Sequence, residues 1–501
     1  MYGYQIEGLN WLLNQRNRKM TAILADDPGL GKTIQTIAFL SAIYYSTVPD
    51  GLRNSDAASS NRGTFPFLVV VPAKLVDNWL AEFRKWAPFL TVTTLFKRAA
   101  KRKNELRSTI FRKDSSDNLD LCCHVLVTNY KAFCHLEAQK QFRKADITWE
   151  AAVFDESDQL NNDQTTTYKT LDMIKAHQRV ILTSAPFLKN IDELLSLLSF
   201  VIPDERESLG QPKAQFGVDS MGVDMMHDKL RPYMLRRLKA GVQLIIPPKY
   251  EINLPISLSK LQNDLYSGVL ENNAHTLQRI ARALHRHSGQ TNNGMSASVG
   301  STLNILMELR RIISHPCLID DVRPAFGEKQ EEQRQLINMS GKLQLLYVLI
   351  PELRARGHRI LLFGQFKGSL IILEDYFAYA EIKYVCLDAD TPQQQRQSIV
   401  NDFNAPDSDI LLFMATTRTT DIGLNLTSAN VVIIYDSDFN PRYNMQAIAR
   451  AHRIGQTKPV LVFKLIVLNS VEKRILEAST RRLAQYHLIM RSVDNEYEEL
   501  V

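Results

Sequence analysis

A glycine-rich segment near the start of the chain has the composition of a phosphate-binding loop. Residues 25–33 read Ala-Asp-Asp-Pro-Gly-Leu-Gly-Lys-Thr, between a short apolar run and the helical run IQTIAFLSAIYY. Gly29 and Gly31 allow backbone amides to turn toward phosphate oxygens at the start of a helix. Lys32 would neutralise the β- and γ-phosphates, and Thr33 would ligate magnesium. The alternative is an ordinary glycine turn that opens a helix, and the strand, loop and helix setting disfavours it.

A pair of acidic residues can complete such a site. The run AAVFDESDQL places Asp155 and Glu156 at the carboxyl end of a predicted strand. Asp155 can hold magnesium through water, and Glu156 can polarise the water that attacks the phosphate. By itself the run would be interpreted as a solvated acidic strand end. The phosphate loop upstream makes a magnesium site the better interpretation.

Two arginines in the second half can act on the same phosphates. The run MQAIARAHRIGQ places Arg450 and Arg453 three residues apart, on one face if the segment is helical. Two guanidinium groups from another domain suit the charge that builds on a departing γ-phosphate. A basic surface helix has the same spacing, so the spacing alone does not decide.

The elements that must position these residues alternate between short apolar runs and amphipathic helices, which is typical of parallel α/β sheets. In the first half the predicted strands are residues 21–24, 67–71, 125–128, 151–154 and 180–182. In the second half they are residues 359–363, 410–414, 431–435 and 460–465. Residues 203–342 between them are predicted to be mostly helical, with a flexible loop at residues 285–301, which are rich in Gly, Ser and Asn. The pattern predicts two similar sheets in tandem.

Length and composition restrict the class of protein. The chain has 501 residues, 45% of them hydrophobic and 23% charged, which is the profile of a folded protein of two to four domains. The five cysteines do not have the spacing of zinc ligands, so we expect no structural zinc. No apolar run is long enough to predict a transmembrane helix, so we expect no membrane partner. A net charge of +6 permits a polyanionic partner without requiring one.

The motifs taken together resemble those of the Swi/Snf family of helicase-like ATPases. In chain order they read YQIEGLNWLL, DDPGLGKT, VVVPAKLVDNW, LVTNY, FDESDQL, ILTSAPFLKN, LLFGQF, TTRTTDIGLNL, VIIYDSDFNP and ARAHRIGQ. The resemblance covers nearly the whole chain, and YDSDFNP followed by ARAHRIGQ is its most specific part. It implies an α/β protein of two tandem RecA-like lobes, a P-loop NTPase of helicase superfamily two with helical insertions.

The resemblance also implies roles for the matching residues, with ATP and Mg²⁺ as cofactors and Gln5 as the glutamine that reads adenine. The implied nucleotide site is Gln5, Asp27, Gly29, Leu30, Gly31, Lys32, Thr33, Gly423 and Gln446, with Thr33 and Asp155 on the metal. The implied catalytic residues are Lys32, Asp155, Glu156, Arg450 and Arg453. The implied DNA-facing residues are Thr128, Asn129, Gln365, Arg418 and Asn425. Phosphate contacts of this kind position a duplex without reading its sequence.

The implied division of the chain has four parts. Residues 1–252 form the ATP-binding lobe, 253–339 a helical insertion, 340–490 the second lobe with a bracing helix, and 491–501 an acidic tail. The bracing helix most resembles the chromodomain-helicase (Mi-two) branch of the family. Because the chain opens almost inside the adenine motif, we expect an excised motor.

Several positions depart from these patterns. The usual Asp-Glu-Ala/Gly-His ends in Ser157 and Asp158, which would weaken coupling between the hydrolysis site and the opposite lobe. Asp421 adds a negative charge near the expected DNA, which electrostatics disfavours. Phe439 replaces a tryptophan and keeps an aromatic face. The other departures are Asp26 in place of the first loop glycine, together with Ser184, Ala185, Thr419 and Thr420.

The expected function is an ATP-dependent motor of a nuclear chromatin remodeller that moves double-stranded DNA relative to histones. Its partners would be DNA, the nucleosome and other subunits of a complex. Two alternatives remain open, namely a catalytically weakened nucleotide- and DNA-binding scaffold and a strand-separating helicase. The retention of Glu156 and both arginines disfavours the scaffold, and the wording of the motifs disfavours the helicase.

Overall fold

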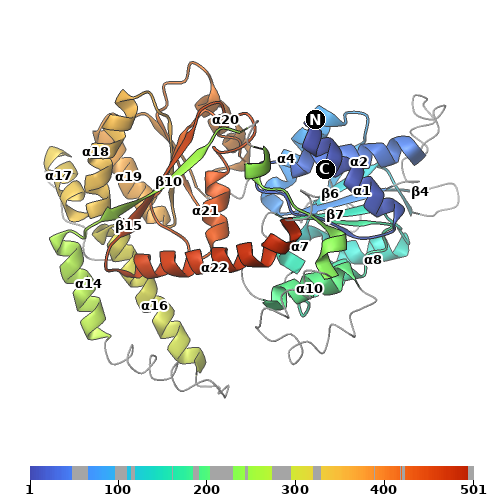
Figure 1. Ribbon diagram of the computed structural model, residues 1–501, viewed down its shortest axis with the longest axis horizontal. Helices are drawn as coiled ribbons and strands as arrows, with labels where there is room; N and C mark the ends of the chain where they lie inside the picture. The colour runs from blue at the N-terminus through green and yellow to red at the C-terminus, as the bar shows by residue number, and fades with distance from the viewer. Residues whose placement is uncertain are drawn as a thin grey trace. The chain divides into compact units, whose positions relative to one another are not determined.

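The chain folds into two compact units, which we call lobe one (Met1–Val242 with Arg482–Val501) and lobe two (Gln243–Arg481) (Figure 1). The structure is a computed structural model. It describes residues 1–47, 66–95, 110–113, 119–160, 162–183, 191–202, 229–242, 246–273, 295–319, 329–388, 390–417, 419 and 424–494. Arg418, Thr420, Asp421 and Gly423, together with Ser184 and Ala185, lie outside the described residues.

Lobe one contains a seven-stranded sheet in the order β3-β6-β2-β7-β8-β1-β9, and every neighbouring pair is parallel. Its strands are β1 (Ala22–Leu24), β2 (Phe67–Val71), β3 (Val92–Leu95), β6 (Val125–Asn129), β7 (Ala151–Asp155), β8 (Arg179–Leu182) and β9 (Met234–Leu235). A separate antiparallel hairpin joins β4 (Phe111–Lys113) and β5 (Leu119–Leu121). The central strands β2 and β6 are buried along their whole length because helices cover both of their faces.

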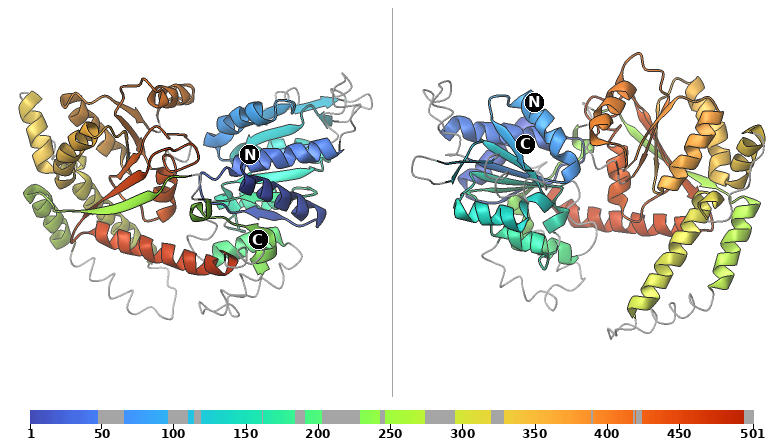
Figure 2. Two further views of the ribbon diagram at one scale, coloured as in Figure 1. Left: turned by 45° about the horizontal axis from the view of Figure 1, so that its top comes forward. Right: turned by 180° about the vertical axis from the view of Figure 1, so that it is seen from behind.

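The two faces of this sheet carry separate cores. Ile23, Leu68 and Val70 point into one core, and Leu24 and Val69 point into the other, as the alternation of a strand requires. The second core receives α1 (Gly3–Asn17), α2 (Lys32–Thr47) and α4 (Val76–Trp86). The first receives α7 (Tyr130–Phe133), α8 (Leu136–Lys144), α9 (Thr166–Asp172) and α10 (Ile191–Val201) (Figure 2).

Lobe two repeats the design with a six-stranded parallel sheet in the order β10-β15-β14-β11-β13-β12. Its strands are β10 (Lys249–Ile256), β11 (Ile360–Gly364), β12 (Tyr384–Leu387), β13 (Leu412–Thr416), β14 (Val431–Ile434) and β15 (Val460–Val467). One face packs against α14 (Lys260–Asn272), α16 (Met295–Ser314), α17 (Lys329–Met339), α18 (Gly341–Ala355) and α19 (Lys367–Tyr379). The other packs against α20 (Gln393–Asn404) and α21 (Pro441–Ile448). The predicted pair of parallel α/β lobes is confirmed.

The structure differs from the sequence prediction at the end of lobe one and at the predicted flexible loop. The expected end of lobe one at residue 252 falls inside β10, which pairs with β15 in the sheet of lobe two. β10 has no apolar run to reveal it, because it is an edge strand exposed along most of its length. The predicted flexible loop at residues 285–301 is wrong over its last part, since α16 begins at Met295.

The last described helix, α22 (Val471–Asp494), begins in lobe two and ends among the residues grouped with lobe one. It corresponds to the predicted bracing helix. None of the helices in the described part of the chain combines the length and apolarity that crossing a bilayer requires.

Candidate nucleotide-binding site

The predicted phosphate loop joins the carboxyl end of β1 to the first turn of α2, as its setting in the sequence indicated. Gly29 and Gly31 have φ angles of +92° and +85°, in the left-handed region that side chains disfavour. A Cβ on Gly31 would also lie 2.5 Å from Nε2 of Gln5. Gly31 is therefore required both by the backbone and by the close approach of the predicted adenine-reading residue.

Lys32 lies over this loop. Its Nζ donates to the carbonyl oxygens of Asp26 at 2.6 Å and Asp27 at 3.3 Å. Burial lowers the pKa of the Lys32 ammonium, while the carboxylates of Asp26 and Asp155 act in the opposite direction and raise it. Thr33 follows in the first turn of α2 and is half-buried. An ammonium and a hydroxyl are thus placed beside the amino end of a helix, where phosphate groups bind.

The acidic pair lies at the carboxyl end of β7, as predicted. Asp155 Oδ1 accepts a hydrogen bond from the Glu156 amide at 2.9 Å, and Oδ2 accepts one from Nε1 of Trp79 at 2.9 Å. The Tyr130 hydroxyl donates to the Asp155 carbonyl at 2.7 Å. Glu156 has a φ of +48°, so the chain turns sharply directly after Asp155. These contacts fix the direction of the Asp155 carboxylate.

Both carboxylates are close enough to Lys32 to raise its pKa electrostatically. The structure therefore brings together Lys32, Asp155 and Glu156, which are far apart in the sequence. Carboxylate and hydroxyl oxygens are ligands that Mg²⁺ prefers, so Asp155 and Thr33 are the residues that would hold a magnesium ion.

The predicted adenine-reading residue lies against the loop. Gln5 is 3% exposed, and its Nε2 donates to the Leu30 carbonyl at 3.2 Å, while its Oε1 accepts from the Tyr2 amide at 3.0 Å. The Tyr4 hydroxyl donates to the same Leu30 carbonyl at 2.7 Å. Burial raises the pKa of Tyr4 to about 12, so its phenol stays protonated at neutral pH.

The lobe-one residues expected to face DNA are used for local structure. The Thr128 side chain is fully buried, and its hydroxyl donates to the Leu95 carbonyl at 3.1 Å. Asn129 caps α7 by accepting from the Ala132 amide at 2.9 Å. Both residues form the end of β6, so they shape this edge of the sheet rather than project from it.

The predicted arginines follow α21 in lobe two. The helix ends at Ile448, so Arg450 and Arg453 lie in the turns after it and not on one helical face. Arg450 is 9% exposed, and its Nε donates to the Gln446 carbonyl at 2.9 Å. Arg453 donates from Nη1 to the Leu424 carbonyl at 3.4 Å. Backbone carbonyls therefore orient both guanidinium groups.

Gln456, in the same motif, was not singled out from the sequence. Its Nε2 donates to the carbonyls of Ala429 at 2.8 Å and Ala451 at 3.1 Å, and its Oε1 accepts from the Thr457 amide at 2.9 Å. Gln456 thereby holds the turn that carries the arginines against the loop after β13.

Gln365, predicted to face DNA, belongs to a polar network at the carboxyl end of β11. Its Nε2 donates to Asp438 Oδ2 at 2.7 Å, and its Oε1 accepts from Nη2 of Arg310. The Arg310 guanidinium also lies 5.1 Å from the ring centroid of Phe439, which keeps the aromatic face expected of it. Arg310 was missed because it lies in α16, 55 residues from Gln365. Asn425, in contrast, is exposed.

Of the departures from the family pattern, Asp158 lies in a short 3₁₀ helix (Ser157–Leu160) directly after the acidic pair.

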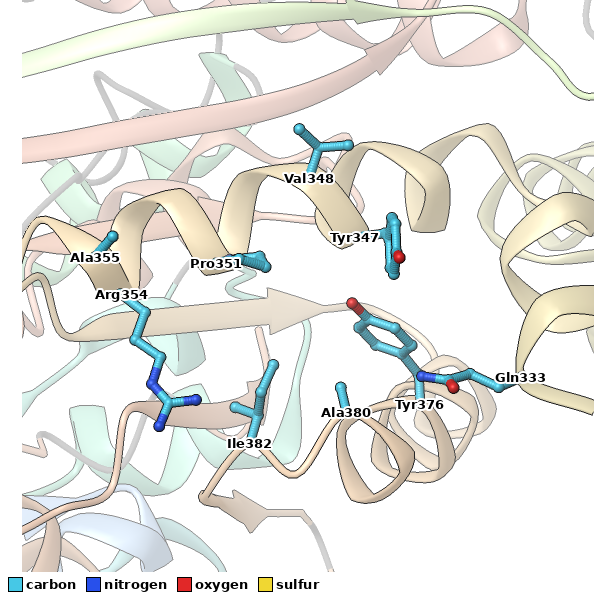
Figure 3. Close-up of a pocket in the computed structure, with 9 residues that line it drawn as sticks. All are labelled: Gln333, Tyr347, Val348, Pro351, Arg354, Ala355, Tyr376, Ala380 and Ile382. Carbon is cyan, nitrogen blue, oxygen red and sulfur yellow. The ribbon is translucent and has the colours of Figure 1, made fainter. Parts of the chain in front are cut away.

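A pocket of about 830 Å³ in lobe two lies among α17, α18 and α19 and is lined by Tyr347, Pro351 and Tyr376 (Figure 3). It contains none of the predicted site residues. The candidate site is therefore identified by its chemistry and not by the volume of a cavity.

Comparison with known proteins gives two family matches, the first over lobe one and the start of lobe two and the second within lobe two. The SNF2-related domain matches residues 4–318, and the helicase conserved C-terminal domain matches residues 341–455. The first begins at Tyr4, beside the adenine-reading residue, and the second ends just after Arg453. Between them the matches include every predicted site residue.

Relatives of similar sequence are chromatin remodelling proteins. Chromatin remodeling factor mit1 of Schizosaccharomyces pombe is 36% identical over 498 residues, 99% of this chain and 33% of that protein. The ISWI chromatin-remodeling complex ATPase ISW1 of Saccharomyces cerevisiae is 34% identical, covering 97% of this chain and 40% of that protein. The CHD3-type chromatin-remodeling factor CHR7 of Arabidopsis thaliana is also 34% identical, covering 98% and 37%. The chain thus spans a third to two fifths of these relatives, and overall identity does not select a branch.

Proposed function

The chain belongs to the SNF2-related family of helicase-like ATPases, and from that premise we propose that it is an ATP-dependent motor that translocates on double-stranded DNA. Its proposed substrate is nucleosomal DNA, which it would move relative to histones in the nucleus, together with other subunits of a remodelling complex. The relatives named as chromatin remodelling factors support this substrate.

One observation carries the proposal of ATP hydrolysis. Lys32, Asp155 and Glu156 lie together at the carboxyl edge of a parallel sheet, beside a loop that two left-handed glycines shape for phosphate. In such a site the Lys32 ammonium binds the β- and γ-phosphates, and Thr33 and Asp155 would hold a magnesium ion that would supply further positive charge there. Glu156 then orients the attacking water and takes up its proton.

Lobe two supplies the remaining charge in this proposal. Arg450 and Arg453 would stabilise the γ-phosphate as it leaves, because guanidinium groups hydrogen-bond its oxygens in the transition state. Gly423 and Gln446 would complete the nucleotide site, and Gln365, Arg418 and Asn425 the DNA side. Thr128 and Asn129 would act on DNA through the strand end that they shape. Alternating binding and release of nucleotide would drive movement along the duplex.

The test is ATP hydrolysis measured with and without duplex DNA. Duplex is expected to stimulate the native chain and to leave Lys32→Ala at background, because the phosphates lose their main cation. Lys85→Ala is the matched control, since Lys85 is an exposed lysine of α4 outside the site. Hydrolysis by the native chain at the level of Lys32→Ala, with nucleotide still bound, would favour the scaffold.

Two further assays separate the remaining alternatives. Sliding of a positioned nucleosome, lost in Lys32→Ala, would support a histone-directed motor. Displacement of a strand from a forked duplex would instead support a strand-separating helicase.

A further inference from the structure

The position at which the general phosphate-loop pattern has its first glycine is occupied here by a buried acid. Asp26 is fully buried, directly before the loop that holds Lys32. Its two carboxylate oxygens accept from Arg237, Oδ1 from Nε at 3.0 Å and Oδ2 from Nη2 at 2.6 Å. This is the planar, two-point pairing that arginine makes and lysine does not.

Arg237 uses its other donors on two further elements. Nη2 donates to Oε1 of Gln35 in α2 at 2.6 Å, and Nη1 donates to the Tyr4 carbonyl in α1. The guanidinium also lies 5.1 Å from the ring centroid of Tyr4. Gln35 closes the network, because its Nε2 donates to Asp26 Oδ2 at 3.1 Å. One side chain therefore contacts the adenine-reading segment, the phosphate loop and the helix that follows the loop.

The backbone around Arg237 is joined to the same loop. The Ala25 amide donates to the Leu235 carbonyl at 2.8 Å, which continues the pairing of β1 with β9. The Asp27 amide donates to the Arg237 carbonyl at 3.0 Å, and the Lys239 amide donates to Asp27 Oδ2 at 3.1 Å. Arg237 is consequently held in place independently of its side-chain contacts.

There is little free space around the network. A Cβ on Gly8 of α1 would lie 2.0 Å from Oε1 of Gln35 and 2.7 Å from Nη2 of Arg237. Helix α1 therefore approaches the side chains of Gln35 and Arg237 closely at Gly8.

We infer that Arg237 is a positioning residue that sets how Tyr4 and Gln5 lie relative to the phosphate loop, and thereby sets the preference for adenine over guanine nucleotides. The inference rests on the proposed use of ATP. Tyr4 and Gln5 both donate to the Leu30 carbonyl of the loop, and Arg237 donates to the Tyr4 backbone carbonyl. Without the fork of Arg237, the link from Tyr4 through the guanidinium to Asp26 is lost, and the hydrogen bonds to Leu30 remain.

The experiment compares two arginines of lobe one. Arg237→Lys keeps the charge and removes the fork. Arg16→Lys is the matched control, because Arg16 also pairs with an acid, donating from Nη2 to Glu150 Oε2 at 2.6 Å, and lies at the far end of the same helix α1. Their side chains are similarly buried, 16% exposed for Arg237 and 23% for Arg16. The dissociation constants of N-methylanthraniloyl-ATP and N-methylanthraniloyl-GTP are measured for each full-length variant, with the melting temperature.

Both variants are expected to melt at a lower temperature, and Arg237→Lys alone is expected to lose about tenfold of the preference for the ATP analogue, the effect of one charge-assisted hydrogen bond. If Arg237→Lys does not fold, Gln35→Met removes one acceptor of the fork and is expected to shift the preference in the same direction by a smaller factor. An unchanged ratio in Arg237→Lys, an equal change in Arg16→Lys, or a native chain without preference would each overturn the inference. This binding measurement needs neither DNA nor hydrolysis. If the native chain binds the ATP analogue preferentially but duplex DNA does not stimulate its ATP hydrolysis, the proposed motor is contradicted and this inference is not.

Discussion

A buried lysine of lobe two offers a quantitative test of how the structure is held. Lys342, in the first turn of α18, has a side chain that is fully buried. Its Nζ donates to Asp436 Oδ1 at 3.0 Å, to Glu472 Oε1 at 2.5 Å and to the Tyr435 carbonyl at 2.6 Å. It therefore ties the end of β14 and the start of α22 to α18. We predict that Lys342→Met is strongly destabilising.

The magnitude follows from what the substitution leaves behind. Methionine retains most of the volume of the aliphatic stem, so the cavity contribution is small. Asp436 and Glu472 keep their burial and lose their cation, and breaking a buried pair in this way costs about 3–5 kcal/mol. A loss of that size is a large part of the stability of a typical domain.

The loss is expected to depend on pH in a defined direction. Burial raises the pKa of Glu472, and the Lys342 ammonium opposes that rise, so its removal raises the pKa further. The folded variant then holds a proton that the unfolded chain releases above its ordinary glutamate pKa, near about 4.3. Stability of the variant must therefore fall as pH rises through the range between the two pKa values. In the native chain, Lys342 has a raised pKa, so its contribution stays constant between pH 6 and 8 and is lost only in strong alkali.

The assay is urea unfolding of the full chain at pH 6 and pH 8, with hydrogen exchange of peptides from α18 and α22 to assign the transition to lobe two. Lys383→Met is the matched control, because Lys383 pairs with Asp409 on the exposed surface of the same lobe and is expected to change little. The reasoning is refuted if Lys342→Met unfolds at the native midpoint. It also fails if the loss becomes smaller as pH rises, because a raised pKa of Glu472 requires the stability of the variant to fall with pH.

Three other predictions follow from single contacts. Trp79→Phe keeps the packed ring but removes the donor to Asp155, so kcat should fall by about tenfold or more and the Mg²⁺ requirement should rise in an ATPase titration, with the ATP KM little changed. Gly31→Ala should weaken binding of a fluorescent ATP analogue, because alanine is strained at a φ of +85° and its Cβ would displace the Gln5 amide. Burial raises the pKa of Glu251, but the ion pairs with Lys464 and Lys249 outweigh it and lower the pKa to about 2. The stability that Glu251 contributes should therefore be lost as pH falls from about 4.5 toward about 2. Glu251→Gln should flatten the acid limb of the melting temperature over that range.

The sequence predicts those parts of the fold that depend on residues close together in the chain. Buried parallel strands such as β2 and β11 are apolar throughout, so their runs are visible without any partner. The need for glycine at positions 29 and 31 can also be predicted from the local sequence, because their left-handed conformations arise within the loop. β10 and β12 are the edge strands of the lobe-two sheet, and neither was predicted. β10 is mostly exposed and of mixed composition, and β12 is a run of only four residues.

What the sequence could not predict depends on partners that are distant along the chain. Arg237 and Asp26 are separated by 211 residues, and nothing near either residue indicates that they meet. Trp79 is buried in lobe one with 1% exposure, and its hydrogen bond to Asp155, 76 residues away, required the sheet order to be known. Arg450 and Arg453 would share a face only if their segment were helical, and that condition is not met because α21 ends at Ile448.

Arg237 and Lys342 show the same principle in the two lobes. Each is a cation bonded to buried acids beside a family motif, and such pairs are poor sources of stability, because well-packed apolar residues often serve as well or better. Hydrogen bonds donated by a guanidinium or an ammonium are directional, however, whereas apolar contacts are not. An apolar replacement of both Asp26 and Arg237 could therefore leave lobe one stable while freeing α1 to shift against the phosphate loop. Charged partners occupy these positions because of the geometry that they impose. If that is correct, the variant with both Asp26 and Arg237 replaced should lose its preference for adenine nucleotides without losing stability.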